Sequence, residues 1–407
     1  MYVSKDGFLS NSRVFCLSHM KKVYVIFFII LFVTASIFVV IQPSQGQFGE
    51  TNENFMWGVE YNPFRKYADP ERDLDIISNS SVQWIRVVFR WRIIESAKNI
   101  HDFTFYDNFV ETATNKSLKI LGVVGSGYDF EIPDWVKAET PTGFGIDNPN
   151  YVTYWKDYVR KTVERYDTIE YWQVENELNH IPAEQRFGDF GSYRRNGDWN
   201  SEKIQEIVTE GARIVKSLIG RKVIINVEVD NPSYFFFARN ITEVWDVDYD
   251  ILGLDFYSYL IDASDPTSGN TIEFYIDNSR QFKEDVIICE TGYTTWTANH
   301  TLEKQEEFIE ITARKAYEKN VLGYFVYKFH DTAKNNERNL PEPYYGLLTN
   351  TKGFKPAWFR YQQIITESST SSTNTQDMVS VFEPPVVFLV MGVVGIIIGA
   401  FIWNRRR

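Results

Sequence analysis

The chain has 407 residues, of which 44% are apolar and 24% are charged, and its formal net charge is -12. This apolar fraction can form a packed core, which excludes a fully disordered chain, and the acidic balance excludes a nucleic-acid binder that depends on clustered Lys and Arg. Two cysteines, Cys16 and Cys289, cannot form a disulfide scaffold, and the sequence contains neither Cys-x-x-Cys nor His-Glu-x-x-His. We therefore expect no metal site.

The N-terminal region joins a basic segment to an apolar one. Residues 1–22 are basic, and residues 23–42 contain no charged side chain. About twenty apolar residues suffice for a helix that spans a bilayer, and the basic flank predicts a cytoplasmic N-terminus. Two interpretations stay open: a transmembrane signal anchor, or a cleaved signal peptide, in particular if translation begins at Met20.

The C-terminal region has the same pattern in reverse order. Residues 386–403 are apolar and are followed by the basic tail 404–407, which predicts a second transmembrane helix with a cytoplasmic tail. Residues 364–385 contain a Ser/Thr-rich stretch and are predicted to form a stalk. Gly395 and Gly399 form a Gly-x-x-x-Gly pair through which two copies could dimerise weakly. The chain between the two spans is therefore predicted to lie outside the cell.

Between these ends, residues 52–363 form one predicted domain without a linker. Short runs rich in Val, Ile, Phe and Tyr recur, separated by amphipathic helical segments such as 151–166 and 201–219. The eight predicted strands are 55–61, 84–91, 118–126, 169–177, 223–229, 251–259, 286–293 and 323–329. Eightfold alternation of strand and helix predicts an α/β fold, a (β/α)8 TIM barrel. A doubly wound sheet also alternates, but its usual Gly-rich phosphate loop does not follow the first strand.

Two of the predicted strands lead into a glutamate near their carboxyl end. These residues are Glu177, at the end of the fourth strand, and Glu290, in the seventh. In a barrel the chemistry takes place at the carboxyl ends of the strands, and a buried charge is costly unless it is paired or used. Cleavage of a glycosidic bond requires one protonated and one ionised carboxyl group. Structural ion pairs are the alternative explanation.

Several motifs occur in an order that is familiar from one group of enzymes. They are 57–63 (WGVEYNP), 85–88 (IRVV), 132–135 (IPDW), 169–179 (IEYWQVENELN), 252–257 (LGLDFY), 288–293 (ICETGY) and 345–348 (YGLL). Together they resemble the retaining glycoside hydrolases of clan A, TIM-barrel glycosidases that include families 5, 39 and 42. The resemblance covers residues 52–362. Each motif alone is weak, and the ordered set carries the resemblance.

The resemblance implies a role for each matched residue. Glu177 would be the general acid and then the general base, and Glu290 would be the nucleophile. Asn176 would hydrogen-bond the 2-hydroxyl of the sugar that is cleaved. Tyr257 would hydrogen-bond Glu290, and Arg86 would favour its ionised form. Retention of configuration implies carboxyl groups about 5–5.5 Å apart, and the chemistry needs neither a metal nor an organic cofactor.

For each of three other side chains, two interpretations stay open. Glu175 is a rival acid or an ion-pair partner, His180 contacts substrate or caps a loop, and Trp296 stacks on sugar or belongs to the core. Many clan members carry a Trp at the end of the eighth strand, and in this chain Phe329 or His330 could take its place.

The sequence as a whole predicts a membrane-bound, outward-facing enzyme that hydrolyses O-glycosidic bonds in a β-linked glycan or glycoside. It would be a retaining β-glycosidase or an endo-glycanase, with carbohydrate as substrate, the membrane as a partner and no nucleic acid. Two alternatives stay open. One is an inactive sugar-binding or surface protein on the same scaffold, and the other is a transglycosylase that uses the same residues. The sequence leaves open which sugar and which linkage are recognised.

Overall fold

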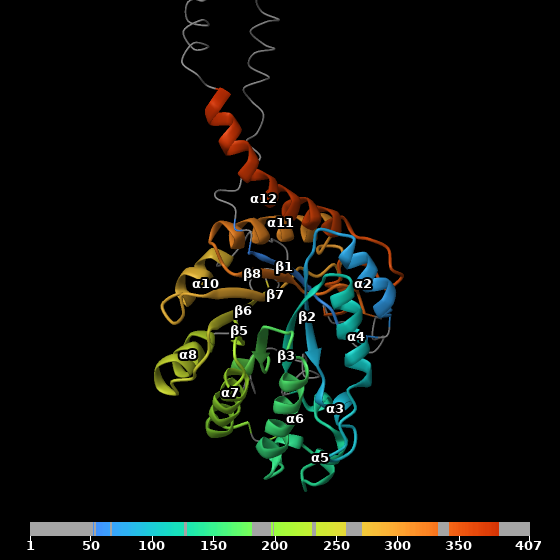
Figure 1. The fold of residues 1–407 in the computed structure, drawn as a ribbon, viewed down its shortest axis with the longest axis vertical. Coiled ribbons are helices and arrows are strands. Elements are labelled where there is room, and N and C mark those ends of the chain that lie inside the picture. Colours follow the sequence, from blue (N-terminus) through green and yellow to red (C-terminus); the bar gives the residue numbers. More distant parts are fainter. Residues whose placement is uncertain are drawn as a thin grey trace, which may run out of the picture. The chain divides into compact units, whose positions relative to one another are not determined.

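The computed structural model describes residues 52, 54–65, 67–125, 128–180, 197, 199–229, 233–257, 271–332 and 342–381, without the side chains of His180 and of 371–381. Eight parallel strands close into a barrel in chain order (Figure 1). They are β1 (Met56–Glu60), β2 (Trp84–Phe89), β3 (Lys119–Val124), β4 (Tyr171–Val174), β5 (Lys222–Glu228), β6 (Ile251–Phe256), β7 (Val286–Thr291) and β8 (Gly323–Val326). The prediction of a TIM barrel is confirmed, and so is each predicted strand.

Helices follow the strands and cover the outside of the barrel (Figure 1). They are α2 (Pro70–Ser78), α3 (Trp91–Ile94), α4 (Thr104–Asn115), α5 (Asp134–Ala138), α6 (Tyr151–Arg165), α7 (Ser201–Lys216), α8 (Tyr234–Arg239), α10 (Ile272–Ser279), α11 (Leu302–Glu318) and α12 (Pro356–Val381). Short turns of other helix types are η1 (Asp129–Glu131), η2 (Gly145–Asp147), η3 (Leu178–His180), η4 (Asn240–Val244) and η5 (Glu342–Tyr344). The two helices expected at 151–166 and 201–219 are α6 and α7.

Local sequence explains where α7 and α11 begin. The Asn200 side chain accepts a hydrogen bond from the Lys203 amide at 3.0 Å, and the Thr301 hydroxyl accepts one from the Lys304 amide at 3.3 Å. A side-chain oxygen at this position satisfies an amide that has no partner inside the helix. The apolar residues then recur at helical spacing and face the strands, which buries them.

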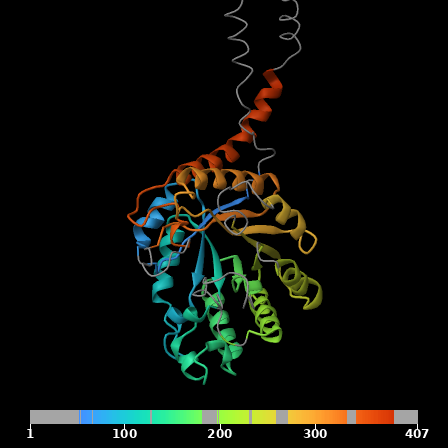
Figure 2. The ribbon, with the colours of Figure 1, turned by 180° about the vertical axis from the view of Figure 1, so that it is seen from behind.

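The barrel closes where β1 pairs with β8, with Met56 opposite Gly323 and Val59 opposite Val326. The C-terminal helix reinforces this closure. The hydroxyl of Tyr361, on α12, lies 2.9 Å from the Gly58 carbonyl oxygen and 3.0 Å from that of Tyr324. Figure 2 shows α11 and α12 together beside this part of the barrel. The last helix therefore holds together the first and last strands.

The structure does not test the predictions for the two termini. The spans 23–42 and 386–403, their basic flanks, and the Gly395 and Gly399 pair lie outside the described residues. In the part of the chain that is described, no helix combines the length and the apolar character needed to cross a bilayer. Helix α12 continues through residues 364–381 of the predicted stalk.

Candidate active site

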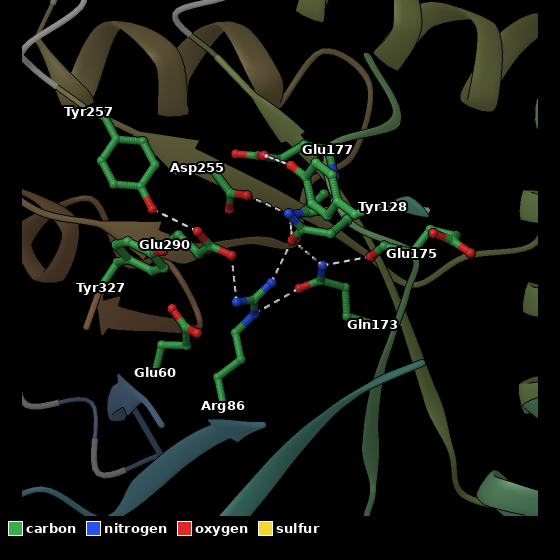
Figure 3. A network of polar contacts seen from close by, with 12 residues as sticks. Glu60, Arg86, Tyr128, Gln173, Glu175, Glu177, Asp255, Tyr257, Glu290 and Tyr327 are labelled. Atoms are coloured by element: carbon green, nitrogen blue, oxygen red, sulfur yellow. Dashed lines mark hydrogen bonds and ion pairs between the residues drawn. The ribbon is translucent and has the colours of Figure 1, made fainter. Parts of the chain in front are cut away.

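Three buried carboxyl groups converge at the carboxyl ends of β4, β6 and β7 (Figure 3). They belong to Glu177, Asp255 and Glu290, and one oxygen of each lies within 4.8 Å of the others. Burial of several carboxylates together is unfavourable because their charges repel one another in a medium of low dielectric constant. The groups around them therefore determine which carboxyl is ionised.

Arg86, on β2, lies beneath these groups and is 1% exposed. Its guanidinium donates hydrogen bonds to Glu290 Oε1 at 2.6 Å, to Asn176 Oδ1 at 2.7 Å and to Gln173 Oε1 at 3.0 Å. The structure thus brings Arg86, Asn176 and Glu290 together as the sequence predicted. A buried guanidinium in contact with a carboxylate stabilises its ionised form.

Glu290 has a second donor in Tyr257, which follows β6. The Tyr257 hydroxyl donates to Glu290 Oε2 at 2.6 Å, and burial followed by the charge of Glu290 raises the pKa of Tyr257 well above 10, so the phenol keeps its proton. Burial raises the pKa of Glu290 to about 7, and the charge of Glu177 adds to the rise, while Arg86 and the Tyr257 hydrogen bond oppose it. The group of carboxyls around Glu290 consequently holds a proton near neutral pH.

Glu177 has a different environment. Its Oε2 accepts a hydrogen bond from the Tyr128 hydroxyl at 3.2 Å, and its backbone amide donates to Asn226 Oδ1 at 2.9 Å. The contact from Tyr128 is long and neutral, whereas Glu290 has a cation and a phenol at 2.6 Å. Charge-assisted hydrogen bonds are stronger than neutral ones, so these donors favour the ionised form of Glu290.

Asn176 Oδ1 accepts hydrogen bonds from Arg86, from Gln173 Nε2 at 3.0 Å and from Asn226 Nδ2 at 2.9 Å. These donors fix the orientation of the amide, since only its oxygen can accept them. A donor role toward a sugar hydroxyl would fall to Nδ2 of Asn176. That role stays a prediction.

The sequence prediction did not identify Asp255, Asn226 and Tyr128. Asp255 is 0% exposed, and burial, followed by the charges of Glu290 and Glu177, raises its pKa well above 3.8. Asn226 Nδ2 donates to Asp255 Oδ2 at 2.5 Å. Asp255 lies two residues before Tyr257 and so shares its strand face. Asn226 is a polar residue within an apolar strand. Both could therefore have been found from the strand pattern. Tyr128 lies in a loop, where the sequence has no periodic pattern that would identify it.

Glu175 does not lie beside Glu290, although simple alternation would place it on the same face as Glu177. Strand β4 ends at Val174, and Glu175 and Glu177 have positive φ angles of 61° and 48°. The Glu175 carboxylate lies against Gly125 and the Trp155 indole, and Figure 3 shows it pointing away from the other carboxyl groups. The interpretation of Glu175 as a rival acid is therefore wrong.

His180 and Trp296 are not connected to this site by the structure. The side chain of His180 lies outside the described residues. Trp296 is half-buried in the loop after β7, and its ring centroid is 5.6 Å from that of His300. Their roles in substrate binding stay predictions.

At the end of β8, the side chain beside the candidate nucleophile is Tyr327 and not Phe329 or His330. The Tyr327 ring lies 5.8 Å from the Tyr257 ring, beside the candidate nucleophile. Phe329 instead packs on Trp358 at 5.6 Å, and His330 Nε2 lies 2.8 Å from Asp73 Oδ2. Both of these side chains are buried, so the expectation that one of them is a sugar platform is wrong.

Comparisons with known proteins agree with the barrel. No protein-family model matches the sequence, and no curated protein matches it. A family 1 β-glucosidase from Thermotoga maritima is similar in structure, with a TM-score of 0.60, 14% identity, and coverage of 78% of this chain and 98% of that chain. A β-glucosidase from Thermotoga maritima in complex with castanospermine has a TM-score of 0.62, 14% identity, and coverage of 79% and 99%.

An exo-β-1,4-mannosidase from Opitutaceae bacterium strain TAV5 has a TM-score of 0.58, 12% identity, and coverage of 79% of this chain and 63% of that chain. These structural neighbours are TIM-barrel glycosidases, and at these identities the likeness shows a common fold.

Proposed function

We propose that this chain hydrolyses β-glycosidic bonds with retention of configuration, with Glu177 as acid/base and Glu290 as nucleophile. The fold it shares with β-glucosidases and a β-mannosidase supports this proposal. The observation that carries it is the pair of buried glutamates, whose nearest oxygens lie within 4.8 Å and whose surroundings differ. Retaining glycosidases have carboxyl groups about 5–5.5 Å apart, and inverting ones about 6.5–9.5 Å to admit a water.

In the first step, Glu290 attacks the anomeric carbon as the bond from that carbon to the leaving oxygen breaks. The leaving oxygen takes the proton of Glu177, and the sugar becomes an ester of Glu290. Arg86 and Tyr257, each 2.6 Å from one oxygen of Glu290, keep the nucleophile ionised and fix its direction. In the second step, Glu177 takes a proton from water, the oxygen of that water attacks the anomeric carbon, and Glu290 leaves as a carboxylate.

A group of three carboxylates could also bind a cation, and the contacts of Glu290 bear on this alternative. Arg86 Nη1 is 2.6 Å from Glu290 Oε1 and provides a positive charge at that oxygen. The acid/base pair requires one neutral and one ionised carboxyl group, which the unequal donors supply. The hydrolytic function therefore accounts for the arrangement more fully than a metal site does.

The test is turnover of 4-nitrophenyl β-glycosides by the full chain and by Glu290→Ala and Glu177→Ala. We expect each substitution to lower the rate by about 10²–10⁴-fold or more. Added azide should rescue Glu177→Ala with a β-glycosyl azide product, and Glu290→Ala with an α-glycosyl azide. Azide enters from the side of the removed carboxyl group, and the two glutamates lie on opposite faces of the sugar. Glu111→Gln, an exposed carboxylate on α4, is the control. Full activity of Glu290→Ala would rule out the proposed mechanism.

We also propose that the barrel is held at the outer surface of a cell membrane. The apolar segments 23–42 and 386–403, each with a basic flank, support this location through the positive-inside rule. Three Asn-x-Ser/Thr sites, at Asn79, Asn115 and Asn299, lie on exposed residues of the barrel. Digestion of intact cells with an external protease should remove the barrel, and protection of the barrel in intact cells would contradict this location.

A further inference from the structure

Asp255 is the third carboxyl group of the candidate site, and it has no part in the reaction proposed for the two glutamates. It lies on β6, whose pairing with β7 shifts directly before Asp255 and passes over Cys289. Asp255 is thereby opposite Glu290, and in the view of Figure 3 its carboxyl lies between those of Glu290 and Glu177. Irregularities of this kind are common beside active sites, where they redirect a side chain.

The contacts of Asp255 differ from those of Glu290. Asp255 is 0% exposed, and its Oδ2 accepts a hydrogen bond from Asn226 Nδ2 at 2.5 Å. Among the described residues, no amide, hydroxyl or cationic donor reaches Asp255 Oδ1, and no Lys, Arg or His forms an ion pair with this carboxyl. The guanidinium of Arg86 contacts Glu290 instead. The carboxyl of Asp255 is therefore fully buried and has a neutral amide as its donor.

These surroundings favour the protonated form of Asp255. Burial removes the water that would solvate a carboxylate. Burial, followed by the negative charges of Glu290 and Glu177, raises the pKa of Asp255 well above 3.8, while the charge of Arg86 acts against the rise. The ionisable side chains near Asp255 are those of Glu177, Glu290, Arg86, Cys289 and Tyr257, with Glu228 opposite it on β5. The one cation among them is paired with Glu290.

A protonated Asp255 has a hydrogen to donate, and its neighbours limit where that hydrogen can go. One oxygen each of Glu177, Asp255 and Glu290 lies within 4.8 Å of the others. Both oxygens of Glu290 already accept hydrogen bonds at 2.6 Å. A hydrogen bond between Asp255 and Glu177 contributes to the raised pKa of Asp255, after burial and the charges of the two glutamates. Two carboxyl groups can share a hydrogen bond only when one of them carries a proton.

We propose that Asp255 is a neutral carboxylic acid that donates a hydrogen bond to Glu177, which positions the acid/base and stabilises its ionised form. When Glu177 passes its proton to the leaving oxygen, it becomes a carboxylate. The Asp255 hydroxyl then donates to that carboxylate without adding a negative charge beside Glu290. Asp255 keeps its own proton through both steps and is a positioning residue. This inference rests on the proposed glycosidase function and adds the residue that tunes its acid/base.

The first measurement detects the proton of Asp255 without turnover. A protonated carboxyl group has an infrared C=O band that is distinct from the bands of a carboxylate. The spectrum of Glu177→Gln at neutral pH is compared with that of the double variant Glu177→Gln/Asp255→Asn, so that Glu177 contributes to neither. We expect a protonated-carboxyl band that is present in the first and lost in the second. Equal bands in the two spectra would overturn the inference.

The second measurement compares Asp255→Asn with Asp255→Leu through pH profiles on 4-nitrophenyl β-glycosides. Asparagine keeps a neutral donor, whereas leucine has a similar size and no donor. We expect kcat to fall by about 100-fold or more in Asp255→Leu, and by only about 10-fold in Asp255→Asn. In Asp255→Leu the alkaline limb of kcat/KM should move to higher pH by about 0.5–1 unit, because ionised Glu177 loses a donor and its pKa rises.

The opposite protonation state of Asp255 gives a different result. If Asp255 were ionised, Asp255→Asn would remove a negative charge beside Glu290, and the acidic limb would move to lower pH by about 1 unit or more. That shift, or an unmoved alkaline limb in Asp255→Leu, overturns the inference and leaves the proposed function intact. Asp255→Ala replaces Asp255→Leu if the latter does not fold, and Glu111→Gln is the control. If the wild-type chain hydrolyses no glycoside, the proposed function fails and this inference fails with it.

Discussion

Glu290 and Glu177 are the same kind of residue and differ in the donors that surround them. Glu290 accepts hydrogen bonds from a guanidinium and a phenol, each at 2.6 Å, while the carboxyl of Glu177 accepts one from the Tyr128 phenol at 3.2 Å and lies beside the carboxyl of Asp255. The donors to Glu290 favour its ionised form, and repulsion between the carboxyl groups disfavours a second negative charge beside it. The difference that we propose between acid and nucleophile thus comes from the side chains around each glutamate.

Replacement of Tyr257 by Phe tests this assignment through pH dependence. The lost hydrogen bond favours ionised Glu290, so its removal raises the pKa of Glu290. Because the nucleophile must be ionised, the acidic limb of the kcat/KM profile should move to higher pH, and the maximal rate should fall about 10-fold or more. Tyr154→Phe, on α6 and far from the site, should leave the profile unchanged. An unshifted acidic limb in Tyr257→Phe would contradict the role of Tyr257.

At this scale the sequence predicted the residues that lie on matched strands and missed those that depend on packing. Arg86, Asn176 and Tyr257 occur in ordered motifs, and the structure places them around Glu290. Glu175 and Tyr128 could not be placed, because a left-handed turn after β4 and the path of a loop decide their directions. Neither feature has a periodic signal in the sequence.

At the scale of elements, the end of β3 and the end of β4 fit together. Gly125 follows β3 with a φ of 78°, a backbone conformation that side chains disfavour, and the Glu175 carboxylate occupies the space that a side chain there would need. The turn that directs Glu175 away from the mouth, and Glu177 into the site, therefore depends on a glycine directly after the neighbouring strand β3.

Gly125→Ala should consequently destabilise the fold more than the strained backbone alone explains. We expect a loss of about 2–4 kcal/mol, of which about 1–2 kcal/mol is the cost of a left-handed alanine. Gly143→Ala is a matched control, since Gly143 has a φ of 77° and no atom within 4 Å of the added methyl. Unfolding in urea measures the free-energy loss of each variant relative to wild type. Equal losses in the two variants would show that the packing against Glu175 contributes nothing.

The eight strands were predicted in full, yet their observed ends are shorter. The predicted strand 169–177 is observed as Tyr171–Val174, and 323–329 as Gly323–Val326. Apolar runs mark which residues are buried, but the ladder ends where the backbone turns outward. Glu177 lies in such a turn and was located only approximately by the strand pattern, whereas Glu290 lies within β7.

At the scale of the whole molecule, the barrel depends on contact between its two ends. Tyr361 of α12 places its hydroxyl between carbonyl oxygens of β1 and β8, and it is fully buried. Elements more than 300 positions apart in the chain are joined by this one side chain. Closure of the barrel is thus coupled to docking of the last described helix.

Tyr361→Phe should therefore lower the free energy of unfolding by about 1–3 kcal/mol, because buried carbonyl oxygens lose a donor while the ring still packs. Tyr234→Phe provides the comparison, since that buried tyrosine on α8 makes ring contacts, and it should cost less than about 0.5 kcal/mol. Catalytic constants measured well below the unfolding midpoint should be unaffected. Equal stability of Tyr361→Phe and wild type would contradict the role of this helix in closure.

The thiol of Cys289 lies inside the barrel immediately before the candidate nucleophile. It packs among Met56, Ile224 and Phe325, is 0% exposed, and burial raises its pKa well above 9. A thiol reagent can react only when β7 separates from its neighbours. In a Cys16→Ser background, the rate of labelling would report how often the barrel opens, and a sugar that binds the closed barrel would slow it. The fold thus contains a reporter with which candidate ligands can be ranked without any turnover.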